Sequence, residues 1–330
     1  MRARKLVTAL TAVSLVLGLA TGCGSDSDKT GAAGADGATK IRLVTTSPTV
    51  TLLAIYAAEQ QGFFKNHGLD VAVTSVNDAT TIPAAIGKQF DVGWTVQPIG
   101  INAAASGVPL TIVGGGERNQ PHNQQLFLLS AKGSKYKTVA DLAGAKIGTA
   151  TLAGANTMLV KATLDKAGVD LKSVQFVQVG FSDMPDQLAA GAVDVIAVSP
   201  PNSQIALDAG AQNLGASPYN IISETALTTF LMANTSWAKE HTEALASMRA
   251  ALDEGGKWIN DHPAEAKTLL SKRTGLDAAK VDKLALQLPR YTYQDYNAQD
   301  FVPWVELMKN YGTLSKSTDA NQLITKMLGK

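Results

Sequence analysis

The sequence predicts an α/β protein of two domains, each a mostly parallel sheet flanked by helices. One observation is a strand–helix–strand pattern over residues 41–74, and a second is a set of similar units that begins near residue 138. The third is the length of 330 residues, which is too great for one compact core and suits two domains.

The stretch over residues 41–74 is the clearest of these units. Residues 41–44 and 69–74 have the apolar or alternating character of strands, and Ser47 before Pro48 is typical of a helix start. A strand, a helix and a strand in this order predict a parallel pair with a right-handed crossover. Ligands of such sheets bind beyond the carboxyl ends of the strands, so we expect residues 47–49 to lie at a ligand site.

Further elements repeat this pattern along the chain. The expected strands are 90–94, 110–113, 126–129, 146–149, 174–179, 193–198 and 229–233. The expected helices include 97–105, one that begins at Asn156 or Thr157, 183–190, 204–209, 236–260, 263–271, 278–286, 301–311 and 320–328. The helices after residue 236 lack a sheet of their own, so we expect them to pack on the first domain. A weak similarity between residues 85–92 and 189–195 supports two domains of related design.

The first residues predict export and lipid attachment. Residues 1–22 combine a positive start with an apolar run too short to span a membrane, as in a signal peptide. Small residues directly before Cys23 resemble a bacterial lipobox, so we expect Cys23 to be lipidated; an ordinary secretory peptide with an incidental cysteine is the alternative. Residues 24–39 contain no large apolar side chain and are expected to form, with Cys23, a flexible tether.

Composition and spacing exclude several classes of function. The formal net charge of +1 gives no reason to expect nucleic acid as a partner. The four histidines show no metal-ligand spacing, and the chain has no His-Glu-x-x-His, phosphate-loop or nucleophile-elbow pattern. We therefore expect no catalytic residues, no metal and no cofactor.

Several motifs together carry a family resemblance. They are Glu59–Phe64 followed by Gly68–Val71, Gly87–Gly93 followed by Gly107–Leu110, Asp141–Gly148, and Asp261–Ala266. In this order and spacing the chain resembles ABC-transporter solute-binding proteins of the nitrate, sulfonate and taurine type, which are related in fold to the thiamine-pyrimidine synthases. The resemblance covers about residues 40–315.

The resemblance implies a periplasmic-binding-protein-like fold with a ligand cleft between two lobes. Lobe one would comprise residues 40–128 and 224–330, and lobe two residues 129–223, with hinges near 128–132 and 220–228. The implied function is capture of a small polar or anionic solute by cleft closure and delivery to permease subunits with a cytoplasmic ATPase. The protein would be a monomer, anchored through lipid on Cys23 to the outer face of the bacterial cytoplasmic membrane.

Candidate ligand-binding residues follow from strand ends and helix starts, where free backbone N–H groups favour small oxyanions. They are Ser47, Thr49, Asp78, Trp94, Thr95 and Gln97 in lobe one, and Thr151, Asn156, Thr157, Phe181, Ser199 and Asn202 in lobe two. Plain helix capping is the alternative role for Ser47 and Thr157, and core packing is the alternative for Trp94. Arg118 could pair with an acidic ligand, although a solvated loop arginine is the favoured interpretation.

Two other functions stay open at this point. An enzyme like the pyrimidine synthases has a related fold, but that group relies on a cysteine-rich segment and histidines, and the one cysteine here is Cys23. A ligand-binding module that signals to a membrane sensor cannot be separated from a transport protein by sequence. Sulfonate, taurine, nitrate and a pyrimidine-like heterocycle all remain candidate ligands.

Overall fold

The computed structural model describes residues 37–120, 124–283, 290–312 and 314–330. The chain divides into two units, residues 1–32 and 33–330, and every described residue belongs to the second. The expected signal peptide, Cys23 and most of the expected tether lie outside the described residues.

The first sheet has five strands in the order β2-β1-β3-β11-β4. Their bounds are β1 Thr39–Thr46, β2 Leu69–Val76, β3 Val92–Val96, β4 Leu110–Gly114 and β11 Thr229–Asn234. β1 pairs in parallel with β2 and β3, whereas β11 runs antiparallel to both β3 and β4. We call the part of the chain built on this sheet lobe one.

The second sheet repeats this topology. Its order is β10-β6-β9-β7-β8, with bounds β6 Phe127–Ser130, β7 Lys146–Thr149, β8 Gln175–Gln178, β9 Val195–Val198 and β10 Gln212–Asn213. β7 pairs in parallel with β8 and β9, and β6 is the antiparallel strand. Reading from β8, each strand has a counterpart in lobe one, so the expected mostly parallel sheets in two related lobes are confirmed. We call this part lobe two.

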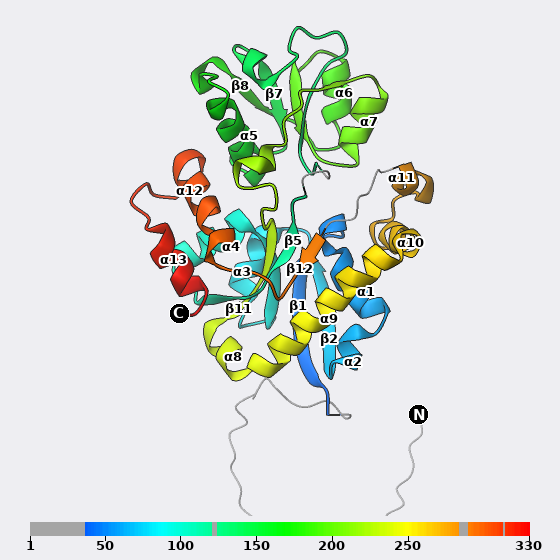
Figure 1. The fold of residues 1–330 in the computed structure, drawn as a ribbon, viewed down its shortest axis with the longest axis vertical. Helices are drawn as coiled ribbons and strands as arrows, with labels where there is room; N and C mark the ends of the chain where they lie inside the picture. Colours follow the sequence, from blue (N-terminus) through cyan, green and yellow to red (C-terminus); the bar gives the residue numbers. More distant parts are fainter. Residues whose placement is uncertain (1–36, 121–123, 284–289, 313) are drawn as a thin grey trace, which may run out of the picture. The chain divides into compact units, whose positions relative to one another are not determined.

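Helices flank both sheets (Figure 1). Those that precede the second sheet are α1 Leu53–Gln60, α2 Phe63–Asn66, α3 Ile82–Ala85 and α4 Gln97–Ala105, and those of lobe two are α5 Ala155–Lys166, α6 Met184–Ala189 and α7 Asn202–Asp208. The C-terminal helices are α8 Thr235–Glu240, α9 Thr242–Asp261, α10 Pro263–Thr274, α11 Ala278–Lys283, α12 Val302–Tyr311 and α13 Ala320–Met327. Short 3-10 turns cover Val50–Leu52, Ala79–Thr81, Val139–Leu142, Leu171–Ser173, Pro218–Ile221 and Ala298–Asp300.

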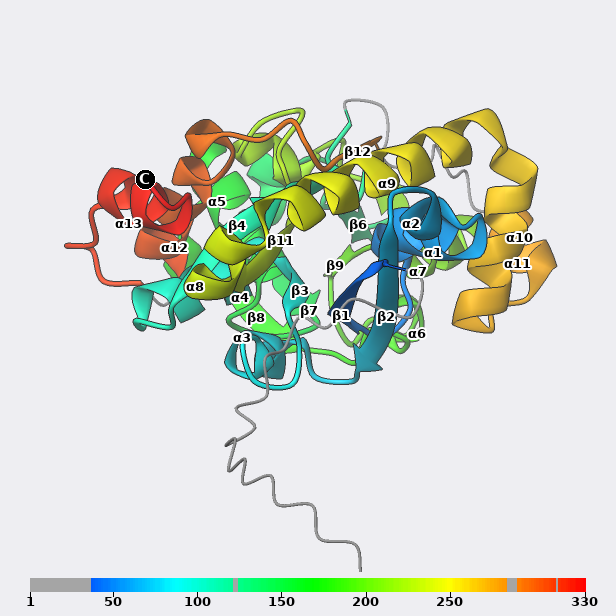
Figure 2. The same cartoon turned by 90° about the horizontal axis from the view of Figure 1, so that it is seen from below.

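The C-terminal helices pack mainly on lobe one. The long helix α9 lies along α1 and α2 and is visible beside them in both views (Figures 1 and 2). Its buried side chains, including Leu245, Met248 and Leu252, join a core cluster with Leu43 of β1 and Ile55 of α1. This apolar face explains why a segment without its own sheet completes lobe one.

The weak repeat noted in the sequence corresponds to one local structure used twice. The Asp91 N–H donates to the Arg42 carbonyl at 2.9 Å, and the Asp91 carboxylate accepts the Arg42 N–H at 2.8 Å. Asp194 does the same with Lys146, again at 2.8 Å. In each lobe an aspartate thus fixes the central parallel strand against its neighbour.

A two-stranded sheet connects sequence regions that the pattern did not pair. β5 Gly116–Arg118 runs antiparallel to β12 Arg290–Thr292. Residues 117–125, a polar run that follows the glycines at 114–116, therefore begin in a strand. The interpretation of Arg118 as a loop residue is wrong in this respect. The glycines allow this pairing, because a Cβ at Gly115 would overlap the Thr292 carbonyl and a Cβ at Gly116 would overlap the Thr229 hydroxyl.

Two chain crossings join the sheets and pair with each other. The first crossing is residues 119–126, of which 121–123 are not described, and the second is residues 214–228. Asn119 N–H donates to the Ala226 carbonyl at 2.8 Å, and Thr228 N–H donates to the Glu117 carbonyl at 2.8 Å. The first crossing thus precedes β6, earlier than the segment expected to form a hinge. The lobe boundaries at residues 128 and 223 stay a prediction.

One helix start and one long helix differ from the expectation. Thr49, not Ser47, caps the turn before α1, because its hydroxyl accepts the Thr51 N–H and its backbone is extended. Ser47 instead donates to the Asn77 side chain at 3.3 Å. The single helix expected over residues 236–260 is two helices that meet at His241, where the backbone leaves the helical region.

Candidate functional site

The residues at the strand ends of lobe one make local turn contacts. Thr49 caps the turn before α1, and Asp78 caps the turn before α3 by accepting the Thr80 N–H and hydroxyl at 2.9 and 2.6 Å. These two hydrogen bonds, the hydroxyl one first, lower the pKa of Asp78 from its usual value. Ser47 follows the last residue of β1 and Asp78 lies two residues after β2, so both lie at the carboxyl edge of the sheet, as expected for a ligand site of such a sheet.

The three candidates on and after β3 are buried. Trp94 is 3% exposed and belongs to the apolar cluster with Tyr56 and Tyr293, while Thr95 is fully buried and donates to the Val96 carbonyl. Gln97 is also fully buried, and its amide Nε2 donates to the Leu227 carbonyl in the second crossing at 3.1 Å. Core packing and a ligand contact are both compatible with this position of Trp94.

The candidates in lobe two form two small groups. Thr157, at the start of α5, donates its hydroxyl to the exposed Thr151 carbonyl, and Asn156 lies beside it, partly buried. Asn202, at the start of α7, donates its amide to the Phe181 carbonyl at 2.8 Å, with Ser199 nearby in the chain. Phe181 itself is 40% exposed. Contact of any of the twelve candidates with a solute stays a prediction.

A different set of side chains stands out once the fold is known. Six buried side-chain atoms of the described residues have no hydrogen-bond partner: Tyr56 Oη, Trp94 Nε1, Gln97 Oε1, Glu117 Oε2, Asn119 Oδ1 and Tyr293 Oη. All six belong to lobe one or to the first crossing, and none belongs to lobe two. Buried polar atoms are normally paired, so this cluster requires an explanation.

Glu117 is the most unusual member, and sequence reasoning did not single it out. Its side chain lies in β5 and the residue is 2% exposed. Gln125 of the first crossing donates to Oε1 at 2.7 Å, whereas Oε2 has no partner among the described residues. Burial raises the pKa of Glu117 to about 8. A carboxyl group that changes charge near neutral pH is typical of a functional site.

Aromatic residues surround this carboxyl group. Tyr291 is the cross-strand partner of Glu117 in the β5–β12 pair, and its ring stacks with Tyr293 at 6.4 Å between centroids. Burial, followed by the negative charge of Glu117, raises the pKa of Tyr219 and Tyr291. The tyrosines are therefore neutral hydrogen-bonding groups near Glu117 and supply no positive charge.

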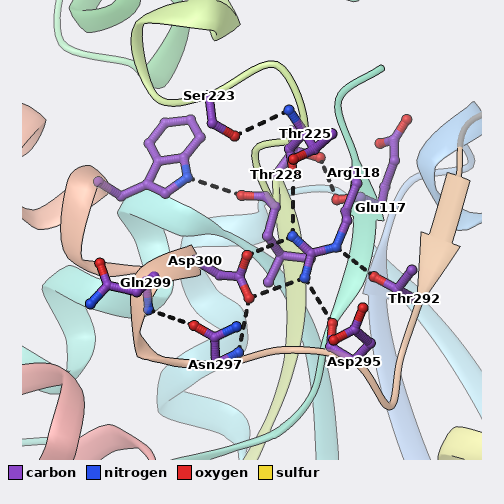
Figure 3. Close-up of polar contacts among 12 residues, drawn as sticks. Glu117, Arg118, Ser223, Thr225, Thr228, Thr292, Asp295, Asn297, Gln299 and Asp300 are labelled. Carbon is purple, nitrogen blue, oxygen red and sulfur yellow. Dashed lines mark hydrogen bonds and ion pairs between the residues drawn. The ribbon is translucent and has the colours of Figure 1, made fainter. Parts of the chain in front are cut away.

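Arg118 points into another environment, contrary to both sequence-based interpretations. Figure 3 shows its guanidinium inside a polar network and the Glu117 carboxylate directed away from it. The two nitrogens Nη1 and Nη2 bind the Asp300 carboxylate at 2.5 and 3.0 Å. The remaining donors reach the Thr292 hydroxyl and the carbonyls of Thr225 and Asp295. All five N–H donors are used, so Arg118 is a structural residue and is neither a solvated loop arginine nor free for a ligand.

Two cavities lie elsewhere in the described residues, and their linings include neither Glu117 nor Arg118. One, of about 460 Å³, opens beyond the carboxyl ends of β1 and β2. Its lining includes Tyr56, Ser75, Lys272 and Arg273, and Arg273 stacks on Tyr56 and pairs with Glu59. The other, of about 330 Å³, lies between α5 and α12.

Neither a metal-binding cluster nor a membrane-spanning helix is found in the described part of the chain. No group of three or more histidine, cysteine, aspartate or glutamate side chains there could hold a metal ion. Within the same residues, no helix combines the length and apolarity that crossing a membrane requires.

A family model described as NMT1/THI5 like matches residues 50–266 of the chain. One relative is the "Putative binding protein YtlA" of Bacillus subtilis, 22% identical over 302 residues, which are 88% of this chain and 89% of that protein. Another is a "Putative thiamine biosynthesis protein" of Haemophilus influenzae, 33% identical over 144 residues, or 43% of this chain and 44% of that protein. The second match thus spans less than half of either protein.

Among solved structures, the periplasmic aliphatic sulphonate binding protein SsuA from Escherichia coli has a similar fold. The TM-score is 0.72 with 20% sequence identity, over 82% of this chain and 86% of SsuA. At this identity the likeness establishes the fold alone. It agrees with the two repeated sheets described above, so the expected fold class is confirmed. The family itself is shown by the model that matches residues 50–266.

Proposed function

The chain belongs to the NMT1/THI5-like family, and from this premise we propose that it is the extracytoplasmic solute-binding component of an ABC importer. It would capture a small solute by closure of its two lobes and deliver the solute to permease subunits coupled to a cytoplasmic ATPase. The observation that carries the proposal is the group of buried, unpartnered polar side chains in lobe one and the first crossing.

The arrangement of the crossings supports a closing motion. Few segments connect the sheets, and the hydrogen bonds of Asn119 with Ala226 and of Glu117 with Thr228 hold the two crossings together. A rotation of one lobe about such paired strands changes backbone angles at a few residues and leaves each sheet intact. Binding energy obtained only in the closed arrangement would then shift the population toward closure.

Several finer features belong to the same proposal. The lobes would divide near residues 128 and 223, and the cleft would be lined by members of the twelve candidates named above. Export, lipidation of Cys23 and anchoring at the outer face of the cytoplasmic membrane would keep a monomer near its permease. Sulfonate, taurine and nitrate are the first solutes to test, because SsuA, with a similar fold, is named for sulphonate binding.

The test is a thermal-shift screen combined with small-angle X-ray scattering of the full chain. A solute at about 100 times its dissociation constant adds roughly 2.7 kcal/mol to the free energy of unfolding. We expect at least one solute to raise the melting temperature and to reduce the radius of gyration. A solute that raises the melting temperature without compaction would contradict the closure mechanism.

The relative named for thiamine biosynthesis favours a second candidate, an enzyme related to the pyrimidine synthases. The described residues contain no cysteine, and no group of three or more of their histidine, aspartate and glutamate side chains could hold a metal ion. The distinguishing measurement is mass spectrometry of a stabilising solute after incubation with the protein. Recovery of the unchanged solute supports binding, whereas conversion into a product supports the enzyme.

A further inference from the structure

We infer that the solute presents a positively charged, hydrogen-donating nitrogen to Glu117, so that its class is an organic cation or a zwitterion and not a simple oxyanion. This inference rests on the proposed function and narrows its solute class. It departs from the expectation of helix N-termini that bind small anions.

The first argument is the unsatisfied carboxyl group. Glu117 is 2% exposed, one oxygen accepts from Gln125, and the other has no partner among the described residues. Burial of an ionised carboxylate without a cation is costly, so burial raises the pKa of Glu117 and the free protein holds the carboxyl group protonated near neutral pH. A donor supplied by a solute would satisfy Oε2 and favour the ionised form.

The second argument is the nature of the neighbouring free atoms. Gln97 and Asn119 use their amide nitrogens for contacts to the second crossing, Gln97 to Leu227 and Asn119 to Asn220 and Glu224. Their carbonyl oxygens, Gln97 Oε1 and Asn119 Oδ1, are left without partners.

These amides lie close to Glu117 in the strand network. Asn119 follows Glu117 by two residues in an extended segment, which places both side chains on one face of the strand. The Gln97 N–H donates to the carbonyl of Thr228, the residue that also pairs with the Glu117 backbone. The two amide oxygens only accept hydrogen bonds, and Glu117 accepts as well once it is ionised, so the three side chains together favour a solute with N–H groups.

The third argument is the aromatic surface beside the acid. Tyr291 lies opposite Glu117, Tyr293 stacks on Tyr291, and Trp94 belongs to the same buried cluster. Electron-rich ring faces attract organic cations, and the attraction grows when water is excluded. Trp94 Nε1 and Tyr293 Oη are themselves unpartnered and could bind a polar substituent of the solute.

The side chains that the structure describes supply no cation to this carboxyl group. Arg118 is adjacent in sequence, but its five donors are used by other partners and its side chain lies on the opposite face of β5 (Figure 3). No lysine or arginine whose side chain is described forms an ion pair with Glu117. The contacts that cover Glu117 come partly from Gln125 and Thr228 in the crossings, which are the segments that lobe opening would move.

The experiment compares matched probes on the full chain and on two variants. The cations benzylamine and benzamidine are paired with their neutral analogues benzyl alcohol and benzamide, and taurine, methanesulfonate and nitrate complete the set. Glu117→Gln keeps the shape and the acceptor for Gln125 but removes the charge. Glu224→Gln removes an exposed acid of the second crossing and is the matched control.

We expect at least one cationic or zwitterionic probe to raise the melting temperature of the wild type and of the control E224Q, and its neutral analogue to raise both far less. In E117Q the affinity for that probe, measured by calorimetry, should fall at least about tenfold, which corresponds to about 1.4 kcal/mol. Equal affinity in E117Q and wild type would overturn the inference.

The result also separates this inference from the proposed function. If no cation or zwitterion stabilises the wild type, the inference is overturned whatever the anions do. Stabilisation by methanesulfonate or nitrate, unchanged in E117Q, would then leave solute binding supported and place recognition elsewhere. Stabilisation by no probe at all would count against both.

Discussion

The two lobes have the same strand order but differ in how they treat buried polar side chains. In lobe two, the two buried polar candidates have local partners, since Asn202 bonds to Phe181 and Thr157 to Thr151. In lobe one and the first crossing, six buried atoms have no partner among the described residues. The two lobes share one strand order, but the unpartnered buried polar atoms of the described residues all lie in lobe one and the first crossing.

This difference suggests a division of roles between the lobes. Unpartnered buried groups reduce stability and persist where they serve recognition, because a ligand can supply the missing partners. On this account lobe one with its crossing recognises the solute, and lobe two closes over it. The same strand contains both kinds of residue, since Arg118 is fully bonded and Glu117 is not.

The largest expected change in the free energy of unfolding comes from a change of pH. The usual pKa of a glutamate is 4.5, and burial raises that of Glu117 to about 8. The folded state holds a proton that the unfolded state releases between these values, so stability falls as pH rises from about 4.5 to about 8. The loss is on the order of several kcal/mol.

Urea denaturation at pH 5 and pH 8.5 measures this loss. E117Q should abolish most of it, whereas E224Q should retain it. The tyrosines that face Glu117, Tyr219, Tyr291 and Tyr293, have pKa values raised chiefly by burial and stay neutral in this range. If the free energy of unfolding changes equally with pH in the wild type and in E117Q, Glu117 is not the source of the pH dependence, and the contrast drawn between the lobes loses its main support.

Removal of Arg118 is expected to be nearly as damaging. Arg118→Met leaves the Asp300 carboxylate, 13% exposed, without its cation and should cost about 3–5 kcal/mol. Unfolding by urea provides the measurement. The double variant R118M/D300L should recover part of the loss, and only part, because Asp300 also accepts the Asn297 N–H. A loss below about 1 kcal/mol would show that Arg118 is not a structural anchor.

Trp94 allows a smaller and more selective change. Trp94→Ala would empty a core site and cost about 3–5 kcal/mol, which would obscure any binding effect. Trp94→Phe keeps an aromatic ring but removes the unpartnered Nε1, so we expect at most about 1.5 kcal/mol of destabilisation. Calorimetry should show weaker solute binding. Unchanged affinity would assign Trp94 to packing alone.

The smallest effect concerns the repeated aspartates. Asp91 accepts the backbone N–H of Arg42 and also its guanidinium, at 3.1 and 2.7 Å, whereas Asp194 accepts the Lys146 N–H. Asp91→Asn should cost more than Asp194→Asn, by about 1 kcal/mol, because Arg42 is partly exposed and its ion pair is screened. Denaturation of both variants tests this, and the reverse order would break the correspondence of the lobes.

Local patterns in the sequence predicted most of the regular fold. The parallel units around β1 and β7 followed from strand and helix periodicity, and a capping box at Thr138 marks the start of the second set of units near residue 138. β5 and β12 were missed, because their pairing joins residues far apart in sequence and the glycines before β5 suggested a loop. The alternation of Tyr291, Thr292 and Tyr293 was the available signal for β12.

The candidate site was less predictable for the same reason. Strand-end rules identify caps such as Thr49 and Asp78, which lie at the sheet edge. They do not identify Glu117, because its importance arises from burial against β12 and the second crossing. Arg118 appeared to be solvated in a polar run, and only the tertiary contact with Asp300 explains its burial.

The most direct test follows the Glu117 carboxyl group itself. Carbon NMR of protein labelled at glutamate carboxyl carbons, with E117Q used for assignment, gives its titration with and without the cationic probe that stabilises the wild type. The account predicts a midpoint near 8 in the free protein and a clear decrease when the cation binds, since binding favours the ionised carboxylate. A midpoint that the bound cation leaves unchanged would contradict recognition of the solute by Glu117.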